Sequence, residues 1–389
     1  MNNIPSRGFD ISEYENRLDS IQRLMHSQKM DAILLTTQVD IEYYTGFKTQ
    51  FFQSPTRPWY VLIPSDNKPK AIIPTIGESG MRQTWLDDIR TWTSPNPKDD
   101  GISLLLATIK SLTSKYKCLG VPKSQESTLR MPLDDYEGLI NSLSGIEIKD
   151  ANKILRQVRV VKSSAEIDKI RHICQLTSQG FIELIDLLKA GDSERENCQR
   201  FKQCLLALGV DDSPYIVAGS GKDGYGSIIM GPGDKIIEEG DLFIIDTGSV
   251  FDSYFCDFDR NFAFGHICDE VKKAYKVVFD ATDAGFSAAQ VGNTTSDVFH
   301  AMNDVLQKGG ALGNSVGRLG HGLGLQLTEW PSNTATDNTT LRPGVILTLE
   351  PGMAYLPGKE MVHEENIVIT ESGPEWLTKR ASEELPIIQ

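Results

Sequence analysis

The chain has 389 residues, of which 39 are Lys or Arg and 53 are Asp or Glu, so its formal net charge is −14. A composition of 40% hydrophobic and 24% charged residues supports a full hydrophobic core and excludes a disordered or collagen-like chain. The acidic balance argues against binding to nucleic acid or to an anionic membrane, because phosphate contacts need clustered cations. At roughly 150 residues per domain, the length favours two or three domains.

Cysteine usage and the N-terminal sequence bear on the cellular compartment. The six cysteines include no C-x-x-C pair and lack the dense spacing of a secreted disulfide framework. The N-terminal stretch is polar, unlike a signal peptide, and no apolar run approaches the ~18 residues of a membrane span. The sequence therefore predicts a soluble cytoplasmic protein with reduced thiols.

The first part of the chain alternates helix and strand signals. A helix is predicted from Asp10 onward, because Leu18, Ile21 and Met25 recur at helical spacing. Short apolar runs bounded by turn residues then predict buried strands at residues 31–37, 59–64, 70–74, 117–121 and 146–148. This alternation predicts an α/β domain over residues 1–155.

A second domain is predicted over residues 156–389. Ser163 and Glu166 form the pattern of a capping box, in which a hydroxyl and a carboxylate satisfy the free amides at the start of a helix. Further helices alternate with Gly-rich, strand-like segments at residues 216–219, 242–245, 345–349 and 366–370.

Five separate segments contribute acidic or imidazole side chains, mostly beside glycine: Asp246 in D-T-G, Asp257 in C-D-F-D-R, His321 in G-H-G-L-G, Glu350 in E-P-G and Glu364 in H-E-E-N. A turn at residues 249–253 allows a hairpin that brings Asp246 and Asp257 to one side of a sheet. One imidazole and four carboxylates form an oxygen-rich ligand set for hard or borderline divalent cations. Each segment alone is more typical of a turn, a loop or a strand end.

In their order and company, these segments resemble the motifs of the creatinase, prolidase and aminopeptidase P group, the M24 or "pita-bread" metallopeptidases. Residues 41–47 are similar to the family's Y-x-T-G-F segment, and residues 158–167 to its R-x-x-K-S-x-x-E-I segment. The resemblance covers nearly the whole chain. It implies an α/β (α+β) fold, with a creatinase-like N-terminal α/β domain and a C-terminal pita-bread catalytic domain.

The resemblance also implies two divalent metal ions, drawn from manganese, iron, cobalt and zinc. Asp246 would chelate one ion, and Asp257 and Glu364 would bridge both. His321 and Glu350 would complete the ligands of the second ion, and Glu350 would also be the general base. Carboxylates suit such a site, because shared oxygen ligands hold two cations ~3.5–4 Å apart, where they jointly deprotonate a water.

Glu365 competes with Glu364 for the last ligand position. Residues 366–370 are similar to the final strand of the family, and matching them places the ligand at Glu364. A slip of one residue would move the side chain to the opposite face of the strand, so the choice decides which glutamate can reach the metals.

Two positions depart from the group's peptidases, which place two further histidines beside the metals. The nearest residues here are Ile229 and Thr328, and neither can donate a proton as an imidazolium does. Those histidines hold the substrate amide and its oxyanion in the peptidases, so their absence argues against ordinary peptidase chemistry. Simple drift within a prolidase-like enzyme is an alternative of equal weight.

The loop at residues 51–59 concentrates aromatic side chains around one arginine. In this family the N-terminal domain of one subunit often reaches the active site of its partner. Arg57 and Trp59 are therefore candidate substrate clamps, and Thr328 is a third candidate substrate-binding residue. Packing of the loop on its own domain is the alternative.

The resemblance therefore predicts a homodimeric metallohydrolase that cleaves a C–N bond, either in an Xaa-Pro dipeptide or in a small amide-like metabolite. Two alternatives stay open. One is a metal-dependent lyase acting on a small charged metabolite such as dimethylsulfoniopropionate, and the other is a non-catalytic binding protein on the same scaffold. Neither nucleic acid nor a membrane is an expected partner.

Overall fold

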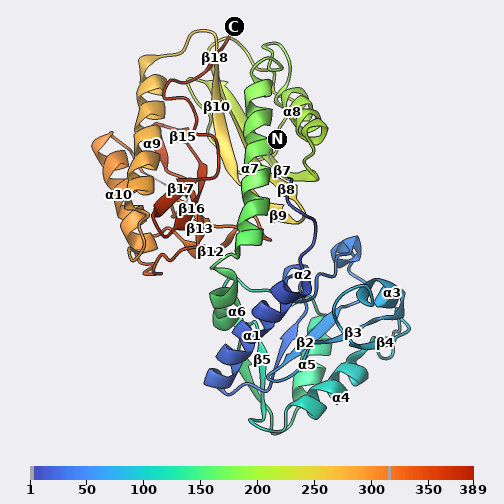
Figure 1. Cartoon of the computed structure of the whole chain (residues 1–389). Helices are drawn as coiled ribbons and strands as arrows, with labels where there is room; N and C mark the ends of the chain where they lie inside the picture. Colours follow the sequence, from blue (N-terminus) through green and yellow to red (C-terminus); the bar gives the residue numbers. More distant parts are fainter. Residues whose placement is uncertain (1–3, 314–316) are drawn as a thin grey trace. The chain divides into compact units, whose positions relative to one another are not determined.

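The computed structural model describes residues 4–313 and 317–389 (Figure 1). Its contacts divide the chain into two compact units, one formed by Ser6–Arg159 and one containing Val160–Gln389. The predicted domain boundary at 155/156 falls inside helix α6 (Asn152–Arg159), which belongs to the first unit. Among the described residues, no helix combines the length and apolarity needed to span a membrane.

The N-terminal unit is a six-stranded sheet with the order β4-β3-β2-β1-β5-β6. The sheet is mixed, because β1 pairs antiparallel with β2 and parallel with β5. Its strands are β1 (Ala32–Leu35), β2 (Tyr60–Pro64), β3 (Lys70–Pro74), β4 (Asp88–Trp92), β5 (Cys118–Val121) and β6 (Glu147–Asp150). Its helices, besides α6, are α1 (Ile11–Gln28), α2 (Gln38–Thr45), α3 (Glu78–Met81), α4 (Ile102–Leu112) and α5 (Leu133–Ser142), with short 3-10 turns at Gln50–Gln53 and Thr75–Gly77.

Five of these strands and the first helix follow the predictions from apolar runs and helical spacing. Strand β4 was not predicted, because all five of its side chains are only half buried and Asp88 and Arg90 pair with each other on the sheet edge. An edge strand with charged side chains lacks the apolar signal of a central strand. The core beneath the sheet contains Leu34, Leu62 and Ile109, all fully buried.

The C-terminal unit contains two five-stranded sheets and a hairpin. One sheet has the order β18-β10-β8-β7, with β9 paired to β8, and the other has the order β12-β11-β13-β16-β17. The first comprises β7 (Asp212–Lys222), β8 (Asp241–Phe251), β9 (Tyr254–Phe255), β10 (Phe258–Phe264) and β18 (Ile387–Ile388). The second comprises β11 (His321–Gly322), β12 (Glu329–Ser332), β13 (Ile346–Leu349), β16 (Glu365–Thr370) and β17 (Gly373–Trp376). The hairpin is β14 (Gly352–Leu356) with β15 (Lys359–Val362).

Four helices flank these strands: α7 (Ser164–Leu184), α8 (Glu194–Leu208), α9 (Asp269–Ala288) and α10 (Thr295–Lys308). In Figure 1, α7 and α8 lie on one side of the strands and α9 and α10 on the other. The predicted capping box begins α7, where Ser163 accepts from the Glu166 amide at 3.3 Å and its own amide donates to the Glu166 carboxylate at 2.9 Å. The four strand-like segments predicted for this part lie within β7, β8, β13 and β16. The α/β fold class is therefore confirmed.

Candidate metal centre

The two sheets of the C-terminal unit bring the predicted metal ligands together. Ligand atoms of Asp257, His321 and Glu364 all lie within 4.8 Å of one another, and all three residues are buried. Nε2 of His321 is 3.4 Å from Oδ2 of Asp257. Asp246 and Glu350 line one small cavity, and their charges raise the pKa of Glu364. The five side chains, which span residues 246–364 of the sequence, thus form one cluster.

The hairpin predicted between the two aspartates is confirmed. β8 runs to Phe251, and Asp252 and Ser253 then take positive φ angles of 49° and 72° in the turn before β9. Asp246 lies opposite Asp259 in the β8–β10 register, and Asp257 lies directly before β10. The hairpin therefore delivers both predicted ligands from one supersecondary unit.

Asn366 of the other sheet fixes the backbone of Asp257. Its Oδ1 accepts from the Asp257 amide at 2.9 Å, and its Nδ2 donates to the Asp257 carbonyl oxygen. The thiol of Cys174 donates to the same Oδ1 at 3.4 Å. These bonds join β16 to the start of β10, and they explain why side chains from two sheets meet at one point.

The imidazole of His321 is oriented for metal binding. Its Nδ1 is 2.8 Å from the carbonyl oxygen of Gly322, which can only accept, so Nδ1 carries the proton and the Nε2 lone pair faces Asp257. Its amide donates to the hydroxyl of Thr348 at 3.1 Å. Gly320 precedes it with a φ of +114°, and a Cβ there would lie 2.2 Å from the carbonyl oxygen of Thr348. Only glycine permits this close approach of β11 to β13.

Glu364 and Glu365 lie in opposite environments. Glu364 belongs to the cluster with Asp257 and His321, and its Oε1 is buried without a hydrogen-bond partner among the described residues. Glu365 instead pairs with Arg260 at 3.0 Å and with Arg380 at 3.2 Å. Neighbouring side chains of an extended segment point to opposite faces, so only Glu364 can reach the cluster.

The pKa shifts of the clustered residues indicate that a cation would stabilise their ionised carboxylates. Burial and neighbouring carboxylates raise the pKa of Asp246, of Asp257 and of Glu364 well above the usual carboxyl range. Burial also raises the pKa of Glu350, and it lowers the pKa of His321. Close, buried carboxylates resist ionisation unless a cation neutralises them, and divalent ions do so most strongly.

The donor set fits divalent metal. Oδ1 of Asp246 and Oε1 of Glu364 are buried acceptors without a hydrogen-bond partner among residues 4–313 and 317–389. Buried polar atoms are normally paired, so such acceptors beside an oriented imidazole suit a divalent cation as ligands. The cavity that Asp246, Asp259 and Glu350 share has a volume of about 10 Å³, enough for about one water molecule.

Asp259 and Arg260, neighbours in the C-D-F-D-R segment, do not form a side-chain salt bridge with each other among the described residues. Arg260 donates to the backbone oxygens of Asp259 and Glu364, and its ion pair is with Glu365. The Asp259 carboxylate is buried on the cluster side, 3.8 Å from Nδ1 of His363. Adjacent residues of β10 point to opposite faces, which is why the two side chains cannot pair.

The positions that replace peptidase histidines lie at the surface of the C-terminal unit. Ile229 is 80% exposed, whereas its neighbour Ile228 lines the small cavity beside Asp246 and Glu350. Thr328 is exposed, and its hydroxyl lies 3.5 Å from Nη2 of Arg318.

Arg318 was not singled out from the sequence. Its positive charge acts to lower the pKa of Asp257, of Glu350 and of His321, so the guanidinium lies within electrostatic reach of the cluster. Its position three residues before His321, a predicted metal ligand, was the available signal. No motif in the neighbouring sequence distinguishes Arg318 from an ordinary surface arginine.

Arg57 and Trp59 lie in the N-terminal unit. The Arg57 guanidinium is 5.7 Å from the Phe51 ring, and its backbone has a φ of +59°. Trp59 is 1% exposed and packs on Phe47 and Phe52, with ring centroids 5.3 and 5.7 Å apart. In this conformation the loop presents Arg57 and Phe51 at its surface, and Trp59 supports it from below.

The chain thus combines an α/β N-terminal unit with a second unit whose two sheets gather four carboxylates and an imidazole. The model of metallopeptidase family M24 matches residues 168–371, and the creatinase/prolidase N-terminal domain model matches residues 17–161. The chain belongs to metallopeptidase family M24. The predicted family and enzyme class are confirmed.

Relatives and solved structures agree with this assignment. An uncharacterized peptidase of Staphylococcus aureus is 26% identical over 357 residues, which cover 91% of this chain and 96% of the relative. Dipeptidase PepE from Mycobacterium ulcerans has the same fold, with a TM-score of 0.86 at 24% identity over 98% of this chain and all of that one. The prolidase from Thermococcus sibiricus gives 0.87 at 22% identity, again over 98% and 100%.

The fold alone does not decide the substrate. The N-terminal domain of the FACT complex subunit SPT16 from chickpea also superimposes, with a TM-score of 0.80 at 17% identity over 98% of this chain and all of that chain. That protein is a subunit of a complex and is not named as a peptidase. The activity of this chain must therefore be argued from its own side chains.

Proposed function

We propose that the protein hydrolyses a C–N bond with two divalent metal ions, in an Xaa-Pro dipeptide or in a small amide-like metabolite. The observation that supports this most is the buried group of Asp257, His321 and Glu364, flanked by Asp246 and Glu350. Such a concentration of buried carboxylates is costly for the fold and is retained where a cation uses it.

The side chains of the proposed site would bind the cations through different atoms. Asp246, Asp257 and Glu364 offer carboxylate oxygens, and His321 offers the lone pair on Nε2. When bound, divalent cations supply Lewis acidity and lower the pKa of a water at the site. The chain itself fixes the ligands: the amide and carbonyl of Asp257 are held by Asn366, so its carboxylate is placed before any cation binds.

Glu350 is the proposed general base. Burial raises the pKa of its carboxyl group, while His321 acts in the opposite direction and Asp246 raises it further. A carboxylate with a raised pKa can accept a proton from water on Oε and return it to the leaving nitrogen near neutral pH. Its place directly after β13, in the cavity with room for one water, suits this exchange.

Arg318 and Thr328 are proposed to hold the substrate. Arg318 makes no ion pair among the described residues, and its guanidinium lies close to both the cluster and the Thr328 hydroxyl. An arginine of this kind suits a carboxylate, which it can bind with two parallel hydrogen bonds. Arg57 from the second subunit of a homodimer is the further proposed contact, with Trp59 supporting its loop. The homodimer and its cytoplasmic location are part of the same proposal.

A second candidate is a metal-dependent lyase on a small charged metabolite such as dimethylsulfoniopropionate. Ile229 and Thr328 favour it, because neither can act as the imidazole that holds a scissile peptide in related peptidases. A non-catalytic binding protein is disfavoured, because all five ligand side chains are present and clustered.

Metal analysis of the purified protein, followed by kinetics, tests the proposal. We expect two divalent ions per chain and turnover of one compound among Xaa-Pro dipeptides, ectoine, creatine and dimethylsulfoniopropionate, assayed with manganese, cobalt, zinc and iron. Glu350→Gln, which removes both the proposed base and one proposed ligand, is expected to lower the metal content by at most one ion per chain and to lose about 10²–10⁴ in kcat. A protein that binds no divalent ion and turns over none of these compounds contradicts the proposal.

A further inference from the structure

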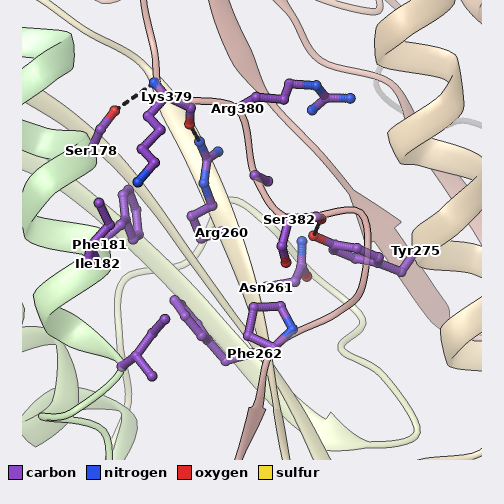
Figure 2. A pocket seen from close by; sticks show the side chains of 13 residues that line it. Ser178, Phe181, Ile182, Arg260, Asn261, Phe262, Tyr275, Lys379, Arg380 and Ser382 are labelled. Atoms are coloured by element: carbon purple, nitrogen blue, oxygen red, sulfur yellow. Dashed lines mark hydrogen bonds between the residues drawn. The ribbon is translucent and has the colours of Figure 1, made fainter.

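A cavity lies behind the candidate metal centre, within the C-terminal unit. Its volume is about 320 Å³, and Figure 2 shows it between helix α7, strand β10 and the segment after β17. Arg260 and Phe262 of β10 line this cavity, whereas Asp259 lines the small cavity at the metal cluster. Because neighbouring side chains of a strand point to opposite faces, the two cavities lie on opposite sides of β10.

The walls of this rear cavity are mostly apolar. Phe181, Ile182 and Ile185 of α7 form one wall, and Phe262 and Pro386 face it. Ile182 is 40% exposed and Ile185 43% exposed, although large aliphatic side chains on a helix of this kind normally face a core. The structure therefore leaves concave apolar surface uncovered at this point, with the size of a small-ligand pocket.

Three cations line the cavity: Arg260, Lys379 and Arg380. No Asp or Glu is among the described residues that line it, although the whole chain carries a net charge of −14. A positive, concave and partly apolar surface on an acidic protein concentrates small anions.

The three cations are not equally available. Arg260 and Arg380 are ion-paired with Glu365, and Arg380 also with Asp283. The ammonium group of Lys379 has no hydrogen-bond or ion-pair partner among residues 4–313 and 317–389, while its backbone amide is anchored to Ser178 at 3.0 Å. Figure 2 shows the Lys379 side chain directed toward the wall formed by Phe181 and Ile182. One unpaired cation thus lies against apolar side chains.

We propose that the rear cavity binds a small organic carboxylate with an apolar tail. The carboxylate lies at Lys379, and the tail packs on Phe181, Ile185 and Phe262. This site is separate from the metal centre and takes a ligand that is not the substrate of the proposed reaction. Binding does not depend on the proposed function.

The floor of the cavity is rigid before any ligand binds. Arg260 donates to the carbonyl oxygens of Glu364 at 3.2 Å and Lys379 at 2.7 Å, in addition to its pair with Glu365. Asn261 donates to the carbonyl oxygen of Val362 at 2.7 Å. A pocket whose polar groups are already fixed loses little conformational entropy when a ligand enters.

Calorimetric titration of the metal-loaded protein with octanoate and with octan-1-ol tests this site. We expect one octanoate per chain at submillimolar concentration. Lys379→Met should weaken octanoate by about tenfold or more and leave octan-1-ol unchanged, because only the carboxylate loses its partner. Ile185→Asp should abolish binding of both probes, because it places a charge in the apolar wall. Lys308→Met on α10 and Leu206→Asp on α8 are matched surface controls, expected to bind like the parent.

Three results would overturn the proposal. One is the absence of octanoate binding to the parent protein at about 1 mM. Another is octanoate binding that survives Lys379→Met but disappears when metal is removed with a chelator, which places the ligand at the metal centre. The third is a change of oligomeric state in Ile185→Asp, measured by light scattering, which makes the apolar wall an interface between copies of this chain.

Discussion

Glu364 and Glu365 are neighbours, both are buried, and their surroundings shift their pKa values in opposite directions. Burial and the charges of four other carboxylates, those of Asp257, Glu350, Asp246 and Asp259, raise the pKa of Glu364 well above the usual range. Burial acts in the same sense on Glu365, but Arg260, His363 and Arg380 outweigh it and hold its pKa well below that range. Glu364 thus belongs to a cluster of like charges, whereas Glu365 belongs to a network of opposite charges.

The charges around the two glutamates suggest different roles: Glu364 in a functional site and Glu365 in a structural ion-pair network. The charge of a buried carboxylate such as Glu365 is neutralised by the two arginines beside it, so it can stay ionised in the folded protein. A buried carboxylate beside other carboxylates destabilises the fold until a ligand arrives, and such groups mark sites of binding or catalysis. The predictions below test whether the two sides of this strand differ in this way.

The largest effect is expected from Asp257→Ala, on the acidic side. A carboxylate proposed to bridge two cations has no substitute among its neighbours, so turnover should fall below detection, by about 10³-fold or more. Metal content measured by mass spectrometry should fall in parallel. Asp234→Ala, on an 85% exposed side chain, is the control expected to behave like the parent. Two bound ions and full turnover in Asp257→Ala contradict the assignment.

The second prediction compares the two glutamates directly in the metal-free protein. Glu365→Gln should destabilise it by about 3–5 kcal/mol, because the substitution removes the buried carboxylate that Arg260 and Arg380 share and leaves Arg260 without an ion-pair partner among the described residues. Glu364→Gln should be neutral or stabilising, because it removes a carboxylate that its surroundings disfavour. Urea unfolding in the presence of a chelator measures both. Equal destabilisation by the two variants would mean that the pair does not divide into a structural and a metal-binding residue.

Much of this organisation could be predicted from the sequence. The apolar runs predicted five of the six N-terminal strands, and the five ligand segments were found from their acidic or imidazole side chains, mostly beside glycine, and from their order along the chain. The similarity of residues 366–370 to the final strand of the family led to the choice of Glu364 over Glu365. These signals are local, and each depends on residues within a few positions of one another.

The remaining features depend on contacts between distant segments. Asn366 holds the backbone of Asp257 across 109 positions of sequence, and no local pattern shows that contact. The ion pair of Arg260 with Glu365 follows from no local pattern either, because Glu365 comes from another sheet. Arg318 carries no motif of its own and becomes a candidate only when the structure places it near the cluster.

The third prediction concerns the substrates that are turned over at the proposed metal centre. Because Ile229 and Thr328 replace imidazoles, Xaa-Pro dipeptides should be poor substrates, since loss of one oxyanion donor costs about 10²–10³ in kcat. A small charged metabolite should be turned over much faster. Steady-state kinetics with each divalent metal decides this. A kcat/KM of ~10⁴ M⁻¹s⁻¹ or more on a dipeptide would instead restore a plain prolidase.

The fourth prediction tests whether Arg318 holds a substrate carboxylate. Arg318→Met should raise KM for an acid substrate by about 10- to 100-fold and change the corresponding amide little, because a charged hydrogen bond is lost only with the acid. Arg195→Met, at an exposed arginine paired with Asp234, is the control. An equal rise in KM for the acid and the amide would mean that Arg318 acts on the charge of the cluster and does not bind the substrate carboxylate.

The smallest effect is a dependence of the free energy of unfolding on pH. The carboxyl groups of the cluster and Glu365 are expected to contribute to this dependence with opposite signs. The carboxyls of Asp246, Asp257 and Glu364 have folded pKa values raised above their unfolded values. Their contribution to stability is fully present below the unfolded carboxyl pKa of about 4 and is lost as pH rises through the folded pKa. Glu365 has a lowered folded pKa, so its contribution is present above about 4 and is lost only as pH falls.

Between about pH 5 and 8, the metal-free protein should therefore lose stability as pH rises, by up to about 1.4 kcal/mol per pH unit for each proton by which the folded state exceeds the unfolded one. Saturating manganese should remove this slope, because a cation lets the cluster ionise without repulsion. Urea unfolding at a series of pH values, with chelator and with manganese, measures both slopes. Asp257→Asn should flatten the slope of the metal-free protein, whereas Glu365→Gln should lower stability throughout this range without flattening it. Identical, flat profiles with and without metal would show that the acidic side is balanced by protein charges alone, and the contrast between the two glutamates would then have no bearing on metal binding.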